Sequence, residues 1–464
     1  MAVVGAFMVP HPPMIVPEVG RGSEKQIAET IQAYEKVAEE IRALAPETII
    51  ITSPHSIMYG DYFHISPGRG AEGDFGKFGA PGVRFSETYD EELVDAVCSM
   101  ATRDGFPAGT LGEKDKRLDH GTMVPLWFIR RKYQEGRIVR IGLSGLPFTE
   151  HYRFGQMIRE AVELLDRRVV FVASGDLSHK LQEYGPYGFA PEGPVYDERI
   201  MDVAGRAAFR ELLEFEESFC DKASECGHRS FVIMAGALDG MSLEVEKLSH
   251  QDVTGVGYGI CTFHPAGKDP ERHFLQQHLT SLRDRLAKER ASSDAYVQLA
   301  RQALEYYTEN GSPMRLPQDV PEDMLRNRAG VFVSIHKHGK LRGCIGTIAP
   351  TESCIAREIM QNAISAAARD PRFSPITEDE LEWLEIHVDV LGVPEPVDSM
   401  KELDVKRYGV IVSCGSRRGL LLPDLDGVDT VEQQVDIARR KGGIREGEKI
   451  SLQRFEVVRH MVTK

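Results

Sequence analysis

The first 260 residues of this chain alternate between strand-like and helix-like segments, which restricts them to a small set of folds. Ala2–Val9 is an apolar run typical of a buried strand, Ser23–Leu44 has the spacing of an amphipathic helix, and Glu47–Thr52 resembles a second strand. Strand, helix and strand in this order predict parallel strands joined by a crossover helix. We therefore expect an α/β domain with a mixed, largely parallel sheet flanked by helices.

The rest of this domain continues the pattern. Two strands and two helices are predicted at Arg137–Leu143, Arg168–Ala173, Asp197–Phe215 and Ser230–Leu238. Two last strands, Ser242–Ser249 and Gly255–Phe263, follow one another so closely that we expect them to pair antiparallel at a sheet edge.

The length of 464 residues allows two or three domains, and the pattern changes after residue 265. Residues 266–289 contain Gly267 and Pro270 and become dense in Arg, Lys and Glu, which is typical of an exposed, partly helical linker. Residues 290–464 predict a smaller α+β domain after the first domain, 1–265. Its helices and strands are expected at Tyr296–Glu309, Val331–Thr347 (a hairpin), Ile355–Ala368, Leu384–Leu391, Gly409–Cys414, Gly419–Leu422, Val431–Lys441 and Ser451–Arg459.

Composition limits the partners and the compartment. A formal charge of −15, without a cluster of Lys and Arg, argues against nucleic acid and anionic membranes, because phosphate contacts need grouped cations. The chain start lacks the features of a secretory signal, and no apolar run approaches a membrane span, so we expect a cytoplasmic protein. Seven scattered cysteines predict reduced thiols, and the absence of a CxxxCxxC motif argues against an iron–sulfur cluster in this chain.

Two histidines follow a proline at the end of a predicted strand. They are His11, after Ala2–Val9, and His55, after Glu47–Thr52. If these strands are parallel, both imidazoles project from the carboxyl edge of one sheet, where open α/β folds bind ligands. His120 and His179 also lie at predicted element ends. The pattern predicts a metal site, although each histidine taken alone could be a hydrogen-bonded loop residue.

A carboxylate would complete a site of two imidazoles and one acid, as in non-haem iron enzymes that activate dioxygen. Glu225 is the best candidate, at the start of a predicted helix, where the helix dipole also favours an acidic side chain for structural reasons. Asp176 precedes His179 by three residues and could orient its ring, or it could cap a turn.

Five motifs resemble the catalytic subunit of class III extradiol dioxygenases of the LigB type, over residues 1–265. They are Val9-Pro-His-Pro-Pro13, Ser53-Pro-His-Ser56, Asp119-His-Gly121, Ser174-Gly-Asp-Leu-Ser-His179 and Glu225-Cys-Gly227. The resemblance implies that His11, His55 and Glu225 hold Fe(II), that His179 is the acid–base residue, and that His120 contacts a small aromatic diol that reacts with dioxygen. A neutral imidazole can take a proton from such a diol at neutral pH.

Memo-type proteins share this fold, resemble the segment Cys226-Gly-His-Arg229 and carry a cysteine where the dioxygenases have glutamate. Glu225 and Cys226 are adjacent, so the sequence leaves the third ligand open. A thiolate would favour a softer ion, Zn²⁺ or Cu⁺.

The hexapeptide Leu341-Arg-Gly-Cys-Ile-Gly346 is the sharpest motif of the second domain. Arg342 beside Cys344 could activate the thiol, or Cys344 could be a buried structural residue. Together with Ala368-Arg-Asp-Pro-Arg-Phe373, Gly419-Leu-Leu-Leu-Pro423 and Arg440-Lys-Gly-Gly443, it resembles the AMMECR domain over residues 290–464. The pair of domains resembles the AmmeMemoRadiSam system, which implies a radical SAM protein as a separate partner.

Three interpretations follow. The first is an Fe(II)-dependent extradiol dioxygenase acting on an aromatic diol or a related small molecule. The second is a Memo-like scaffold, non-catalytic or binding zinc or copper, whose AMMECR domain docks a radical SAM partner. The third is a redox protein acting through Cys226 or Cys344. A homodimer is compatible with such a sheet.

Overall fold

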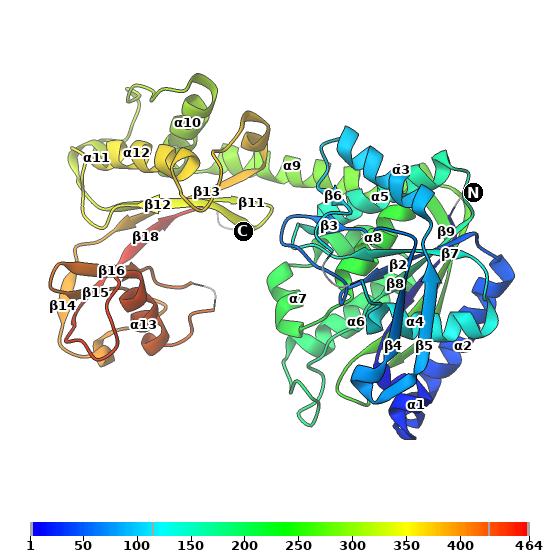
Figure 1. Ribbon diagram of the computed structural model, residues 1–464. Helices are drawn as coiled ribbons and strands as arrows, with labels where there is room; N and C mark the ends of the chain where they lie inside the picture. The colour runs from blue at the N-terminus through cyan, green and yellow to red at the C-terminus, as the bar shows by residue number, and fades with distance from the viewer. Residues whose placement is uncertain (1–2, 114–115, 426, 462–464) are drawn as a thin grey trace. The chain divides into compact units, whose positions relative to one another are not determined.

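The computed structural model describes residues 3–113, 116–425 and 427–461 and divides into two units, 1–279 and 280–464. The first unit contains a six-stranded sheet in the order β7-β2-β8-β1-β10-β9 (Figure 1). Its strands are β1 (Val3–Val9), β2 (Thr48–Ser53), β7 (Arg137–Gly142), β8 (Val169–Ser174), β9 (Met241–Gln251) and β10 (Tyr258–Lys268). The first four are parallel, and β10 and β9 join antiparallel at the edge. The predicted mixed, largely parallel sheet is confirmed, while Ala2 lies outside the described residues.

Helices cover both faces of this sheet. α2 (Ala28–Leu44) and α4 (His120–Lys132) pack on one face; α3 (Glu91–Arg103), α5 (Phe148–Leu164) and α8 (His228–Ala237) pack on the other. Side chains alternate between the faces along each strand, so Phe7 belongs to one core and Met8 to the other. Burial on both faces explains why these parallel strands are nearly continuous apolar runs in the sequence.

The shorter elements of the first unit lie mostly in the connections. They are α1 (Pro17–Gly20), β3 (Phe63–His64), β4 (Gly70–Phe75), β5 (Ala80–Thr88), β6 (Ala108–Gly109), α6 (Glu192–Gly205) and α7 (Glu217–Ala223). The predicted helix Asp197–Phe215 is wrong as a single element. α6 ends at Gly205, Ala207 adopts a left-handed φ of 48°, and a short 3-10 helix follows at Phe209–Glu214.

The second unit has two four-stranded sheets. β12 (Lys340–Gly346), β11 (Val331–Lys337), β13 (Leu384–Leu391) and β18 (Val457–His460) form the first, whose core face packs against α10 (Ala295–Asn310) and α12 (Ile355–Ala368). β14 (Glu395–Val397), β17 (Ser451–Phe455), β15 (Gly409–Cys414) and β16 (Arg417–Leu421) form the second, with α13 (Val431–Lys441) packed against it. The second unit also contains α11 (Glu322–Arg326), and the boundary between the units falls within α9 (Phe274–Ser292).

One prediction for this part of the chain needs correction. The predicted final strand Ser451–Arg459 is two strands, because the chain leaves one sheet after Phe455 and enters the other at Val457. The predicted linker, 266–289, is helical in part, as expected, because α9 begins at Phe274 and continues to Ser292.

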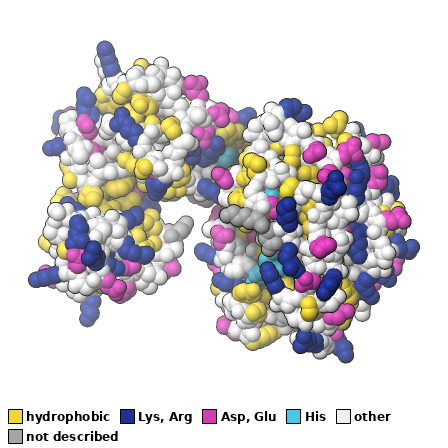
Figure 2. Space-filling view, in the orientation of Figure 1, with side chains coloured by type: hydrophobic (Ala, Val, Ile, Leu, Met, Phe, Trp, Pro, Cys, Tyr) yellow, Lys and Arg dark blue, Asp and Glu magenta, His cyan; other side chains and the backbone are white. Residues whose placement is uncertain are grey.

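Figure 2 shows acidic and basic side chains interspersed over the face in view. Within the described ranges, no helix is both long enough and apolar enough to cross a membrane.

The crossing of α5 and α8 depends on two glycines. A Cβ added at Gly236 would lie 2.0 Å from the carbonyl oxygen of Tyr152, and one added at Gly155 would lie 2.0 Å from that of Ile233. Both contacts involve backbone atoms of the facing helix, so neither can be relieved by a side-chain rotation.

We expect Gly236→Ala to lower the free energy of unfolding by roughly 1–3 kcal/mol, because the two helices must move apart. Urea unfolding of the full chain would measure it. Gly205→Ala is the matched control, since its added Cβ would meet only the Lys247 side chain at 3.9 Å. Equal effects of the two substitutions would contradict the close helix crossing.

Candidate metal centre

Three neighbouring strands each deliver a polar side chain two residues beyond the strand end. His11 follows β1, Asp176 follows β8, and His55 follows β2. Because these strands are parallel, their carboxyl ends meet at one edge of the sheet, which is the ligand-binding edge of open α/β folds.

The ligand atoms of His11, His55 and Cys226 form a compact group at this edge. His11 Nε2 lies 3.0 Å from His55 Nε2 and 3.6 Å from Cys226 Sγ, and all three atoms lie within 4.8 Å of one another. A tetrahedral ion with ordinary metal–ligand bonds separates two nitrogens by about 3.3 Å and a nitrogen from a sulfur by about 3.6 Å. These residues therefore fit a metal ion that accepts nitrogen and sulfur.

Ser174 sets the tautomer of His11. The Ser174 hydroxyl donates to the carbonyl oxygen of Gly121 at 2.6 Å, so in its 2.9 Å contact with His11 Nδ1 the imidazole is the donor. With its proton on Nδ1, His11 turns an Nε2 lone pair toward the group. Burial lowers the pKa of His11 and of His55, so both rings are neutral ligands at neutral pH.

Asp176 connects the two loops that carry His11 and Cys226. The backbone N–H of His11 donates to Asp176 Oδ1 at 2.7 Å, and the backbone N–H of Asp176 donates to Cys226 Sγ at 3.3 Å. Burial raises the pKa of Asp176 to about 6. Asp176, His179 and Cys226 form a second group whose ligand atoms lie within 4.8 Å of one another.

Two glycines bring Cys226 to this edge. A Cβ on Gly175 would lie 2.1 Å from Gly227 Cα, so the loop after β8 and the residue after Cys226 touch backbone to backbone. Because the atom that this Cβ would meet belongs to the backbone, only glycine permits so close an approach at position 175. The thiol is therefore placed by main-chain packing between two segments distant in sequence.

Glu225 lies outside both groups, although it is adjacent to Cys226. Its Oε2 accepts the backbone N–H of His228, the first residue of α8, at 2.6 Å. A carboxylate in this position satisfies a free helix N–H and interacts favourably with the helix dipole. Burial raises the pKa of Glu225 to about 7. The structure brings Cys226, rather than Glu225, to the two histidines.

His120 lies against the same group. Its ring centroid is 4.0 Å from that of His55 and 5.4 Å from that of His11. It is the first residue of α4, whose N-cap, Asp119, accepts the backbone N–H of Thr122 at 3.1 Å. Burial lowers the pKa of His120 to about 3, so the ring is neutral at neutral pH.

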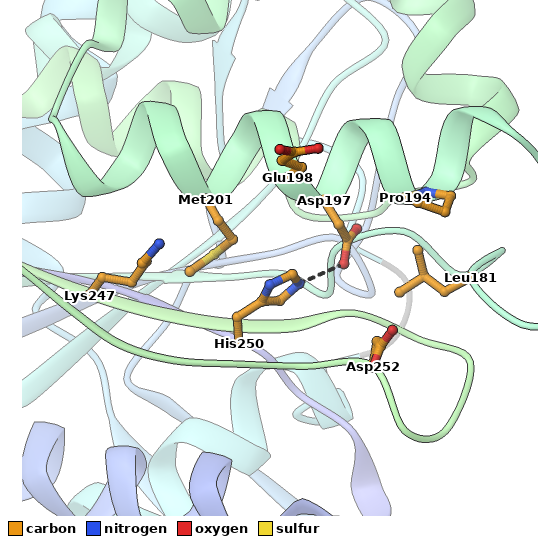
Figure 3. Close-up of a pocket in the computed structure, with 8 residues that line it drawn as sticks. All are labelled: Leu181, Pro194, Asp197, Glu198, Met201, Lys247, His250 and Asp252. Carbon is orange, nitrogen blue, oxygen red and sulfur yellow. Dashed lines mark hydrogen bonds and ion pairs between the residues drawn. The ribbon is translucent and has the colours of Figure 1, made fainter.

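His179 lies in the loop after β8, and the ring of Tyr187 stacks on it at a centroid distance of 5.1 Å. Burial lowers the pKa of His179. The adjacent residue, Ser178, donates its backbone N–H to Asp197 Oδ1 at 2.8 Å. Figure 3 shows Asp197 paired with His250, at 3.0 Å, beside a cavity of about 260 Å³ between α6 and β9.

Sequence reasoning assigned no role to Ser174, Ser53 or Phe78. Ser53 Oγ donates to Asp119 at 2.5 Å and accepts the backbone N–H of His55. Phe78 places its ring 5.3 Å from that of His120. Ser53 and Ser174 stand within the quoted motifs, which is a local signal, whereas nothing in the sequence connects Phe78 to His120.

In the second unit, Arg342 and Cys344 have separate partners. Arg342 donates to both carboxylate oxygens of Glu380, at 3.0 and 2.8 Å, so its charge is paired with an acid. Cys344 Sγ lies 3.3 Å from Ser334 Oγ, and its backbone N–H donates to Asp370 at 2.9 Å.

The geometry thus defines an α/β protein with a candidate metal centre at the carboxyl edge of its sheet. The family described as the catalytic LigB subunit of aromatic ring-opening dioxygenase matches residues 5–261, and the AMMECR1 family matches residues 297–460. The chain belongs to the LigB family and carries an AMMECR1 domain after the LigB domain.

Some relatives match the whole chain and others only part of it. A protein of Clostridium acetobutylicum is 40% identical over 99% of both chains. A protein of Thermotoga maritima is 51% identical over 36% of this chain and 96% of its own length. Among solved structures, an uncharacterized protein of Escherichia coli K12 covers 56% of this chain and 99% of its own, with 13% identity and a TM-score of 0.37.

Ser174→Ala should weaken metal binding about 10- to 100-fold, because His11 loses the acceptor that fixes its Nδ1 proton. Competition with a chelator of known affinity would measure the change. Ser56→Ala is the matched control: Ser56 follows His55, and its buried hydroxyl has no hydrogen-bond partner within the described chain. If both variants kept the wild-type affinity, the tautomer argument would be wrong.

Acid should destabilise the second unit through Glu380. Burial alone would raise the pKa of Glu380, but hydrogen bonds from Arg342 and Lys337 hold it at about 2. A carboxyl group whose pKa is lower in the folded than in the unfolded protein stabilises the fold at pH values above its unfolded pKa, about 4.3. This stabilisation is lost as the pH falls toward the folded pKa of about 2. Glu380→Gln should therefore melt at a lower temperature than wild type at pH 7, with the difference shrinking by pH 3. Glu378→Gln, at an exposed position, is the control. If the melting temperatures of wild type and Glu380→Gln differed by the same amount at every pH, Glu380 would not have a lowered pKa in the folded protein.

Proposed function

We propose that the first unit is a metal-dependent oxidoreductase that opens an aromatic diol, or acts on a related small molecule, with dioxygen as the oxidant. The supporting observation is the convergence of His11 Nε2, His55 Nε2 and Cys226 Sγ within 4.8 Å, with further neutral imidazoles beside them. Membership of the LigB family supports the same reaction class.

A metal ion held by these three residues would supply Lewis acidity toward the diol hydroxyls and, if redox-active, electrons toward dioxygen. His179, with its lowered pKa, takes a proton from a substrate hydroxyl and returns it to the product. Asp176 has a carboxylate oxygen within 4.8 Å of a His179 ring nitrogen and favours the protonated form of that ring electrostatically. His120, neutral and at the helix start, offers a hydrogen bond to the bound substrate.

The donor set bears on the choice of metal. Fe(II) is implied by the resemblance to extradiol dioxygenases, which use a carboxylate as the third ligand. A thiolate from Cys226 favours Zn²⁺ or Cu⁺ instead. Because Cys226, and not Glu225, approaches His11, a second candidate function is a zinc- or copper-binding Memo-like scaffold without ring-opening activity.

Metal analysis of protein purified without oxygen tests the ligand set. We expect His55→Ala and Cys226→Ser to lose most of the bound metal, while Glu225→Gln retains it, because the Glu225 carboxylate hydrogen bonds to the start of α8. Cys98→Ser removes a half-buried thiol elsewhere and is the control. Loss of metal in Glu225→Gln with retention in Cys226→Ser would assign the third ligand to Glu225.

Oxygen consumption with a panel of catechols then separates the two functions. A dioxygenase places both oxygen atoms in the product, so one dioxygen disappears for each ring opened. Metal-loaded protein that consumes no oxygen with any of these diols would favour the scaffold.

The partners are separate proposals. The resemblance of the domain pair to the AmmeMemoRadiSam system suggests a radical SAM protein as partner, and a homodimer is compatible with such a sheet. Sedimentation of the protein alone, and with a purified radical SAM protein, would test each of them.

A further inference from the structure

Two partly exposed aromatic rings lie against the imidazoles beside the metal-ligand group. Tyr187 is 61% exposed and stacks on His179, with ring centroids 5.1 Å apart and an interplanar angle of 24°. Phe78 is 36% exposed and meets His120 edge to face at 5.3 Å. The two rings come from different segments and approach different histidines of the same site.

Both rings stand on anchored segments. Phe78 ends a short 3-10 helix, Gly76–Phe78, and its ring lies 6.0 Å from that of Phe75, which belongs to the buried core. Tyr187 belongs to the loop 181–189, which is closed by a bridge between Leu181 and Phe189.

The loop of Tyr187 is also fixed to the turn between β9 and β10. The backbone N–H of Leu181 donates to the carbonyl oxygen of Gly255 at 3.2 Å. A Cβ on Gly255 would lie 2.6 Å from Gly185 Cα, so the two segments are in close backbone contact. The ring of Tyr187 therefore projects from a loop that is tied down at its base.

Apolar surface at the mouth of a site costs free energy while it faces water, at about 25 cal/mol for each Å². A bare diol ring, whose hydroxyls engage the metal and the histidines, has apolar faces but no group that extends beyond the ring to cover the side chains of Phe78 and Tyr187. An apolar substituent on the ring could do so.

On the basis of the proposed function, we infer that the substrate is an aromatic diol with an alkyl or aryl substituent, and that Phe78 and Tyr187 determine this specificity. Lys77 is next to Phe78 and acts electrostatically on His120, which makes a carboxylate the competing substituent. The two alternatives differ in charge and can be separated by binding experiments.

The test measures binding to zinc-loaded full-length protein, in which no ring opening takes place. Metal content is determined first, so that a failure to bind zinc counts against the proposed function and not against the substituent. Calorimetric titrations without oxygen then compare catechol, 4-butylcatechol and 3,4-dihydroxyphenylacetate. We expect 4-butylcatechol to bind about tenfold more tightly than catechol, because four carbons leave water.

Substitutions test whether Phe78 and Tyr187 produce the preference for 4-butylcatechol over catechol. Phe78→Ala and Tyr187→Ala should each reduce the advantage of 4-butylcatechol over catechol by at least about threefold, while Tyr187→Phe keeps it. Tyr306→Ala, which removes a 42% exposed ring from the second unit, is the control. The inference is overturned by equal affinities of catechol and 4-butylcatechol in zinc-loaded protein. It is also overturned by tighter binding of the carboxylate, or by an unchanged preference in both alanine variants.

Discussion

The parallel alignment of β1, β8 and β2 is the constraint on which the rest of the site depends. These three strands are neighbours, so the residues that follow them, His11, Asp176 and His55, leave the sheet at one edge. A change of strand direction at any of the three would send one side chain to the opposite edge, about 20 Å away for strands of six residues. Helices on both faces bury the strands and keep this alignment fixed.

Burial gives the site its chemistry as well as its shape. His11, His55, His120 and His179 all have pKa values lowered chiefly by desolvation, so they are neutral and can act as ligands or proton acceptors at neutral pH. Burial also raises the pKa of Asp176 to about 6, so this carboxyl group can gain or lose a proton near neutral pH.

The sequence determined more of the fold than of the site. Apolar runs with helical segments between them were sufficient to predict the mixed sheet, and the two Pro-His turns predicted that His11 and His55 meet. Local pattern failed where long-range packing decides the path of the chain. The helix predicted at Asp197–Phe215 breaks after Gly205, and the last predicted strand divides between two sheets at Glu456. Neither break has a strong local signal.

Only the tertiary structure determines which side chain joins His11 and His55 as the third member of the metal-ligand group. Glu225 and Cys226 are consecutive, so any pattern that places one of them near the histidines places the other there as well. The contact between Gly175 and Gly227 and the start of α8 at His228 decide between them, since the thiol turns to His11 and the carboxylate to the helix. The sequence by itself determined which strands carry the histidines, because hydrophobic periodicity is local. Only the tertiary structure decided which neighbouring atom joins them, because the contact between Gly175 and Gly227 joins residues 52 positions apart in the chain.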